Sequence, residues 1–170
     1  MMYKILVFIL SINLLYGFGE NIKSIEADFT QQTKSQDSTL TYKGHFYAKS
    51  NSKAKWIYTA PTHKEIYIND TLTIVYEPLL EQATIGKSRN NIDFLHILQQ
   101  AKQIDKQTYN TTFENTTYTL TTKDNLPYTL EFHDEFDNQI TITFSHIQIN
   151  QTMQDEIFTF VPPPHIDIIQ

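Results

Sequence analysis

The chain has 170 residues and no cysteine, and its 19 acidic and 13 basic residues give a formal charge of −6. Without cysteine the chain has no disulfide framework and no cysteine-linked lipid of its own. An acidic chain without basic clusters argues against binding to nucleic acid and against binding to anionic membrane surfaces. The aromatic fraction of 13% suggests large apolar faces that are filled either by packing or by a ligand.

Residues 1–19 have the pattern of a secretory signal peptide. Lys4 precedes an apolar run, and Gly17 and Gly19 occupy the −3 and −1 positions of a cut before residue 20. The run is too short for a membrane span, which needs about 20 apolar residues, so an uncleaved anchor is the weaker alternative. We expect cleavage to leave residues 20–170 as a single domain with a charge of −7, since Lys4 is the only charged residue removed.

Two segments have helical periodicity. In 21–33, Ile22, Ile25 and Phe29 fall on one helical face. In 91–102, apolar residues cover more than half of the helical circumference, which is typical of a helix that is buried on two sides or covers a cavity.

From Leu40 onward the apolar residues alternate with a period of two, which predicts strands. Asn and Asp pairs take the turn positions that favour positive φ, at 69–70, 124–125 and 137–138 and more weakly at 150–151. The tail 161–170 contains three consecutive prolines and is not expected to form a central strand. These patterns predict a mainly β protein with covering helices (α+β): an antiparallel sheet of about nine to eleven strands and two or three helices.

Catalytic and metal-binding patterns are missing from the sequence. It has no nucleophile elbow, no glycine-rich phosphate loop and no histidine spacing typical of a zinc site. The acidic segment 133–138 is interpreted as a solvated hairpin turn. His96 has a slightly better functional claim than the other histidines. We therefore expect no catalytic residue, no metal and no cofactor.

An apolar stripe is the remaining candidate site, because many segments contribute to it at once. It would lie on the concave face of one curved sheet, either as a self-filled core or as the wall of a cavity for an apolar ligand. The predicted sheet residues of the stripe are Phe46, Trp56, Tyr58, Ile66, Ile68, Ile74, Tyr76, Leu80, Leu130, Phe132, Ile142 and Phe144.

Several motifs resemble one family specifically. They are W-x-Y-x-x-P at 56–61, YEPLLEQAT at 76–84, FTFVPP at 158–163 and FTQQ at 29–32, where the last fits the first helix of the family. In this order they resemble the bacterial periplasmic outer-membrane lipoprotein carrier family over nearly all of 20–170.

The resemblance implies an unclosed antiparallel β-barrel with a helical lid and a hydrophobic cavity for lipoprotein acyl chains. It implies a periplasmic carrier that takes acylated lipoproteins from an inner-membrane ABC-type release complex and delivers them to an outer-membrane acceptor, if one is present. We expect the carrier to be a monomer. The lid would contribute Phe29, Phe94, Leu95 and Leu98 to the cavity. Family members often carry Arg-Pro before the tryptophan as a lid latch. This chain has Ser50 and Asn51 there, so a nearby lysine (Lys49, Lys53 or Lys55) is the candidate substitute.

Three alternatives remain open at this point. A generic periplasmic binder of lipid or another apolar small molecule fits the same stripe. A small outer-membrane β-barrel fits the length and the strand count, although the proline-rich tail and the two helices argue against it. An enzyme is the weakest alternative, since no nucleophile, base or metal pattern is present.

Overall fold

The computed structural model describes residues 18–69, 72–87 and 94–170. The predicted signal peptide, apart from Phe18 and Gly19, lies outside these residues. The strands are β1 (Ser24–Lys34), β2 (Thr39–Lys49), β3 (Lys53–Ala60), β4 (Lys64–Asn69), β5 (Leu72–Glu77), β6 (Gln82–Lys87), β7 (Lys102–Asp105), β8 (Thr108–Phe113), β9 (Thr116–Lys123), β10 (Leu126–His133), β11 (Gln139–Ile149) and β12 (Asp167–Ile169). The helices are α1 (Phe94–Gln100) and two 3₁₀ turns, η1 (Pro78–Leu80) and η2 (Asp155–Phe158).

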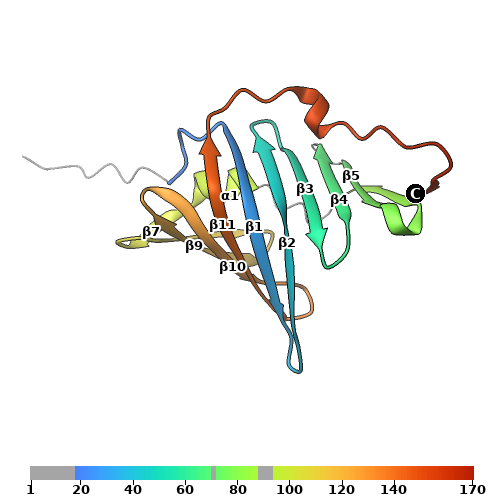
Figure 1. The fold of residues 1–170 in the computed structure, drawn as a ribbon. Coiled ribbons are helices and arrows are strands. Elements are labelled where there is room, and N and C mark those ends of the chain that lie inside the picture. The colour runs from blue at the N-terminus through green and yellow to red at the C-terminus, as the bar shows by residue number, and fades with distance from the viewer. Residues whose placement is uncertain (1–17, 70–71, 88–93) are drawn as a thin grey trace, which may run out of the picture.

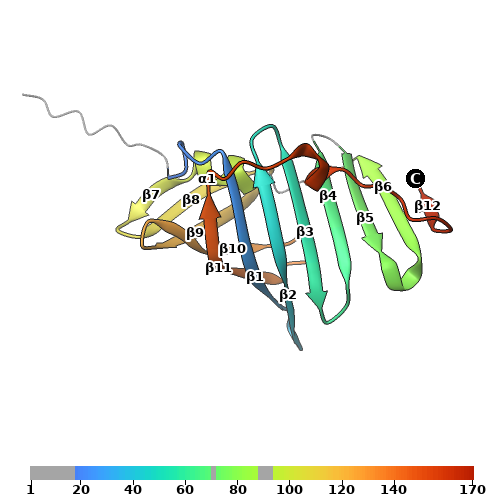
Figure 2. The ribbon, with the colours of Figure 1, turned by 45° about the horizontal axis from the view of Figure 1, so that its top comes forward.

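All twelve strands belong to one sheet, in the order β12-β6-β5-β4-β3-β2-β1-β11-β10-β9-β8-β7 (Figures 1 and 2). Neighbouring strands are antiparallel except β12, which pairs with β6 in parallel. Strands β12 and β7 lie at opposite ends of this order, so the sheet is not closed. This confirms the predicted unclosed β-barrel, with one strand more than the upper limit of nine to eleven. In the described part of the chain, α1 is the only α-helix, which is fewer than the two or three helices expected.

The predicted helix at 21–33 is wrong, because most of this segment forms the central strand β1. Strand β1 pairs with β2 on one side and with β11 on the other. Its buried residues follow a period of two through Ile25, Ala27 and Phe29. The helical interpretation counted Ile25 and Phe29 but not the small Ala27, and the FTQQ motif therefore lies in a strand. Hydrogen bonds and packing on both sides outweigh the weak helical pattern.

The turns follow the predicted use of Asn and Asp. Asp124 and Asn125 between β9 and β10 have φ of 53° and 60°, as a two-residue hairpin turn requires. Asp137 and Asn150 also have positive φ. Of the predicted turn at 69–70, residue 70 lies outside the described part of the chain.

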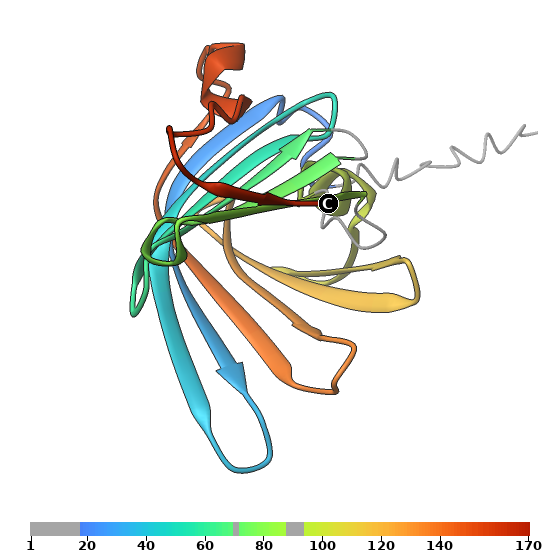
Figure 3. The ribbon, with the colours of Figure 1, turned by 90° about the vertical axis from the view of Figure 1, so that its right-hand side faces the viewer.

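The sheet curves strongly around α1, which lies inside the curve, whereas η2 and the chain after it run outside (Figure 3). We call the side that carries α1 the inner face and the opposite side the outer face. The second predicted helix, 91–102, is confirmed at 94–100, and its first residues, 91–93, are not described. No helix in the described ranges is long and apolar enough to cross a membrane.

Residues 152–170 form a C-terminal arm that runs past β3, β4 and β5 to the far edge of the sheet (Figure 2). The arm ends in the three-residue edge strand β12, whose first N–H group donates to the Glu81 carbonyl at 2.8 Å. The tail is therefore not a central strand, as its prolines predicted.

Candidate functional site

An aromatic cluster occupies the inner face where β1, β2, β3 and β11 meet α1. Phe46 lies at its centre, with its ring centroid 4.1 Å from Trp56, 5.0 Å from Phe94 and 6.2 Å from Phe144. Phe29 contacts Trp56 edge-on at 5.1 Å. Such tilted and edge-to-face contacts are the preferred geometries of aromatic pairs. The cluster therefore forms a continuous apolar surface across four strands.

Gly44 on β2 leaves the space that Phe29 occupies. A Cβ atom at this position would lie 2.7 Å from the Phe29 ring and 2.0 Å from the Ile57 carbonyl oxygen. Any side chain at position 44 would displace the ring or the neighbouring strand. The glycine is therefore part of the packing of the aromatic cluster.

Helix α1 covers this cluster with four side chains, Phe94, Leu95, Ile97 and Leu98, none more than 3% exposed. Phe94 contacts both Phe46 and Phe144 at 5.0 Å. The amide of Gln99 donates to the Ile22 carbonyl at 3.3 Å, which ties the helix to the start of the sheet. The helix thus fills the space in which we expected an apolar ligand, and Trp56, at 5% exposure, is already packed among its neighbours.

Tyr58 marks the polar rim of the cluster. Its ring contacts Phe29 at 5.1 Å, its hydroxyl donates to Gln31 Oε1 at 3.0 Å, and burial raises its pKa to about 12. The ammonium group of Lys64 lies 4.7 Å from the centre of the same ring. The cluster therefore passes from apolar to polar at this end of β3.

Most predicted site residues share the inner face. Cross-strand partners lie on one face of a sheet, and the registers Trp56↔Ile66 and Leu130↔Ile142 place these side chains on the same side as the cluster. The predicted residues that belong to this buried core or pack against it are Phe29, Phe46, Trp56, Tyr58, Ile66, Ile68, Phe94, Leu95, Leu98, Leu130, Phe132, Ile142 and Phe144. Phe29 belongs to the sheet rather than to the lid, since it lies on β1.

Three predicted residues do not belong to this face. The register Trp56↔Ile66↔Val75 places Val75 inside, so its neighbours Ile74 and Tyr76 point to the outer face. Ile74 and Tyr76 are the more apolar of the alternating residues of β5, and the sequence analysis therefore assigned them to the inner face. In the fold they pack under the C-terminal arm on the outer face. Leu80 lies in the turn η1 and is 63% exposed.

Several inner-face residues were not among the predicted site residues. Ile25, Ala27, Ile97, Tyr118, Leu120 and Ile140 belong to the same buried cluster as the aromatic residues. The Tyr118 ring contacts the Phe132 ring in a tilted geometry, with the centroids 5.0 Å apart. The alternation of these residues with a period of two along β1 and β9 was the sequence signal that could have identified those on the two strands.

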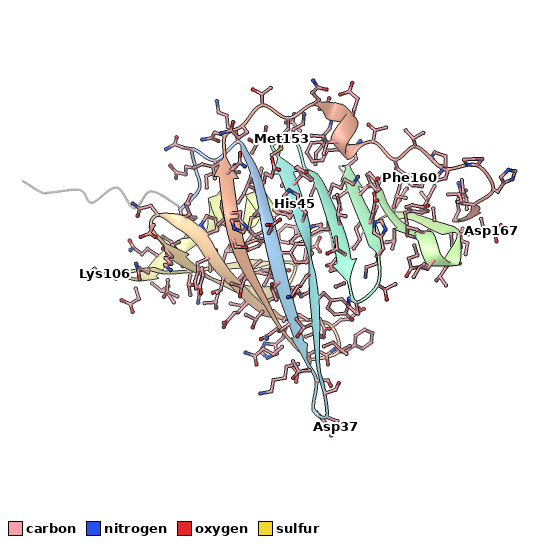
Figure 4. The ribbon with its side chains drawn as sticks, in the orientation of Figure 1. Asp37, His45, Lys106, Met153, Phe160 and Asp167 are labelled. Carbon is pink, nitrogen blue, oxygen red and sulfur yellow. The ribbon has the colours of Figure 1, made fainter. Side chains whose placement is uncertain are left out.

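On the outer face the C-terminal arm packs on β4 and β5. The Phe160 ring lies 5.4 Å from both Tyr67 and Tyr76, and Figure 4 shows it beside these strands. Phe158 is buried, with the Lys49 ammonium group 5.4 Å from its ring centre. The arm and the strands line a small, partly open apolar pocket of about 210 Å³.

Two lysines hold the arm to the sheet. Lys49 and Lys53 both pair with Asp155, at 3.1 Å for Lys53, and their hydrogen bonds lower the pKa of Asp155. Lys55 pairs with Glu65 on β4 at 3.1 Å. All three lysines alternate with inner-face residues and therefore lie on the outer face, away from α1. The interpretation of a nearby lysine as a latch for the helical lid is wrong, because the pairs fasten the arm or an adjacent strand.

A second polar network lies on the outer face of β1, β2 and β11, where Figure 4 labels His45. The two carboxylate oxygens of Asp28 contact His45 Nδ1 at 2.7 Å and His146 Nδ1 at 2.8 Å. These bonds, that of His45 first, lower the pKa of Asp28. Glu26 contacts the other nitrogen of His45 at 3.1 Å. The network ties the three central strands together.

The acidic segment 133–138 forms the turn between β10 and β11. Asp134 accepts hydrogen bonds at 2.9 Å from the N–H groups of Phe136 and Asn138 and from the Asn138 amide. Its oxygens are thus committed to the turn. Within residues 18–69, 72–87 and 94–170, no group of three or more His, Asp or Glu side chains is arranged to hold a metal ion.

Comparisons with known proteins agree on one family. The model of "Outer membrane lipoprotein carrier protein LolA" matches residues 20–126. The chain is 44% identical to an outer-membrane lipoprotein carrier protein of Helicobacter pylori (strain HPAG1), covering 89% of this chain and 82% of that protein. It is 39% identical to the protein of the same description from Helicobacter hepaticus, covering 98% and 94%.

Solved structures support the fold. An uncharacterized conserved protein from Thermus thermophilus aligns with a TM-score of 0.53 and 11% identity, covering 88% of this chain and 91% of that one. A DUF1329 family protein from Desulfovibrio piger aligns with a TM-score of 0.51 and the same identity, covering 82% and 90%. With the match of the family model and the identity to its relatives, the chain belongs to the LolA family of outer membrane lipoprotein carrier proteins.

Proposed function

We propose that this protein is a periplasmic carrier that binds lipoprotein acyl chains on its inner face and moves lipoproteins from the inner to the outer membrane. The relatives at 37% to 44% identity are named outer-membrane lipoprotein carrier proteins. The observation that carries the proposal is that a seven-residue helix, α1, covers the aromatic inner face of a broad curved sheet.

The cover is exchangeable because its contacts are mainly apolar. An isolated helix of fewer than about 12 residues is not stable in water, so α1 depends on the sheet for its structure. An acyl chain can take the place of its side chains because hydrophobic attraction is not directional. The proposed acyl-binding residues of the sheet are Phe29, Phe46, Trp56, Tyr58, Ile66, Ile68, Leu130, Phe132, Ile142 and Phe144, with Phe94, Leu95 and Leu98 on the lid.

The magnitudes favour reversible exchange. Burying four large apolar side chains of α1 contributes about 6 to 12 kcal/mol, at about 1.5 to 3 kcal/mol each. Shielding one long acyl chain from water contributes on the order of 10 kcal/mol, at about 0.8 kcal/mol per methylene. The two are comparable, so cargo can displace the helix and the helix can later displace the cargo.

No chemical step is required for this function, and we propose no catalytic residue and no cofactor. The partners are an inner-membrane ABC-type release complex and, where the organism has one, an outer-membrane acceptor. The signal pattern at 1–19 would place the protein in the periplasm, where we expect a monomer. The acidic chain would dock on basic patches of its partners, in which case association weakens as salt rises.

Release of lipoproteins from spheroplasts tests this function. Spheroplasts of the native host, incubated with the purified protein, are expected to release lipoproteins as soluble one-to-one complexes, and much less without it. A matched control uses the same lipoprotein with its acylated cysteine replaced by serine, which should not bind. Protein isolated with fatty acid or glycolipid, and unable to release lipoproteins, would instead indicate a generic lipid-binding protein.

A further inference from the structure

A polar groove lies on the side of α1 that faces away from the aromatic cluster. Its volume is about 480 Å³, and it lies between the helix and the strands at the β7 edge of the sheet. Its wall is formed by His96, Gln100, Lys102, Asn110, Thr111 and Thr117, with Thr112 beside them. The carrier function proposed above uses the opposite side of the same helix and leaves this groove without a role.

One wall of the groove is an incomplete sheet edge. Strand β7 pairs with β8 only from Asp105 opposite Thr108 to Lys102 opposite Asn110. Strand β8 continues to Phe113, so its last residues, 111–113, have no strand partner on that side in the described part of the chain. His96 of α1 lies beside this stretch, with its ring 5.4 Å from Phe113. An unpaired strand edge presents N–H and C=O groups that can accept an additional strand.

A buried acceptor lies in the same wall. Asn110 Oδ1 is inaccessible to solvent and has no hydrogen-bond partner among the described residues. A buried carbonyl oxygen without a hydrogen-bond donor destabilises the fold. An N–H or O–H group from a bound molecule would remove this cost. Asn110 lines the groove, so rotation of its amide toward the groove would bring this oxygen within reach of such a donor.

The chemistry of the wall matches a polypeptide backbone. The side chains are amides, hydroxyls, an imidazole and one ammonium group, with no carboxylate among them, in a chain whose formal charge is −6. Amides and hydroxyls both donate and accept, as a backbone requires. Contacts to a backbone do not depend on sequence, which suits a carrier of many different proteins.

We propose that this groove binds, as an extended strand, the polypeptide segment that follows the acylated cysteine of the cargo, which rests on the carrier function proposed above. A backbone N–H of the cargo would donate to Asn110 Oδ1, and its strand would pair with β8 at residues 111–113. A helix is about 10 Å across, so about three extended residues lead from an acyl chain under α1 to the groove. One helix would thus separate the lipid from the polypeptide of the same cargo.

Two synthetic ligands test the proposal on the full mature chain. One is a diacylglyceryl-cysteine amide, and the other is the same lipid followed by ten polar residues. The unmodified protein is expected to bind the longer ligand about tenfold more tightly, as an additional set of hydrogen bonds provides. Asn110→Leu, which keeps the size of the side chain but loses its acceptor, should remove most of this preference and leave binding of the lipid amide unchanged. Gln148→Leu, at an exposed amide on the distant strand β11, is the matched control and should retain the preference.

Photo-crosslinking gives a second readout that does not depend on the stability of a leucine variant. A photoreactive residue at Thr112 should crosslink to the peptide part of the longer ligand, and one at Gln148 should not. Equal affinity for the two ligands, an unchanged preference in Asn110→Leu, or absence of the crosslink at 112 would overturn the groove assignment and leave the carrier function intact. Failure of the unmodified protein to bind either ligand would instead overturn the carrier function, and the groove assignment with it.

Discussion

Truncation of Phe94 distinguishes an exchangeable helix from a fixed one. Phe94 is 1% exposed and contacts Phe46 and Phe144, and replacing a buried phenylalanine by alanine costs about 3 to 5 kcal/mol. This cost falls on the state in which α1 covers the sheet. The state in which cargo has displaced the helix loses much less, because Phe94 is then no longer packed against the cluster.

Phe94→Ala should therefore lower stability and raise cargo affinity together. If half of the cost is specific to the covered state, the bound state gains about 1.5 to 2.5 kcal/mol relative to it. This corresponds to roughly a tenfold to sixtyfold lower apparent Kd. Thermal unfolding should show a lower Tm for the ligand-free variant. Titration with a fluorescent lipopeptide measures the affinity, with circular dichroism as the control for folding.

Phe46→Ala is the matched variant on the sheet side. Phe46 is fully buried and should be as costly to truncate, but it forms part of the surface in both the covered and the cargo-bound states. This variant should lose stability and cargo affinity alike. Equal weakening of cargo binding by both variants would refute exchange, because it would mean that Phe94 remains packed on the sheet while cargo is bound.

Three further outcomes follow from individual contacts. Asp155→Asn removes the partner of two lysines, and hydrogen exchange should rise in the C-terminal arm while exchange in the central strands stays unchanged. Asp28→Asn removes a carboxyl whose pKa is lowered by two histidines. Its contribution is fully present above about pH 4, the ordinary aspartate pKa, and is lost as pH falls through the lower folded pKa. The difference in urea stability between the two proteins should therefore disappear in acid, and a difference that grows in acid would contradict this assignment. A chain that begins at residue 20 lacks Phe18, whose ring lies 5.1 Å from the Tyr109 ring. It should be less stable by about 1 kcal/mol than a chain that begins at residue 18. Equal Tm values for the two chains would show that this contact contributes nothing.

Local patterns predicted the sheet well, because alternation and turn chemistry are properties of short segments. Positive φ at Asp124 and Asn125 follows from residues that tolerate it, and no distant contact is needed. The facing of β5 could not be predicted in this way. Ile74 and Tyr76 are the more apolar set of that strand, and only the presence of the C-terminal arm makes the outer face their place of burial.

Local patterns also failed to identify the first strand, β1. Ile22, Ile25 and Phe29 are compatible with a helix, and the choice of a strand depends on β2 and β11, which come later in the chain. The small Ala27, fully buried beside Phe46 of β2, was the residue that distinguished the two patterns. Sequence reasoning therefore found the members of the apolar site more reliably than the face or element to which each belongs.

The contrast between the two covers of the sheet explains why exchange should be confined to α1. The arm is held by ion pairs to Asp155, by ring contacts of Phe160 and by backbone pairing of β12, which lie far apart along the arm. An acyl chain can replace none of the polar contacts, since it has no charge and no hydrogen-bonding group. The described contacts of α1 are instead mainly apolar and are concentrated on one patch. A lipid that competes for apolar surface would therefore displace the helix and leave the arm in place. Cargo binding should then increase hydrogen exchange in α1 but not in the arm. An increase in the arm as well would show that both covers open together.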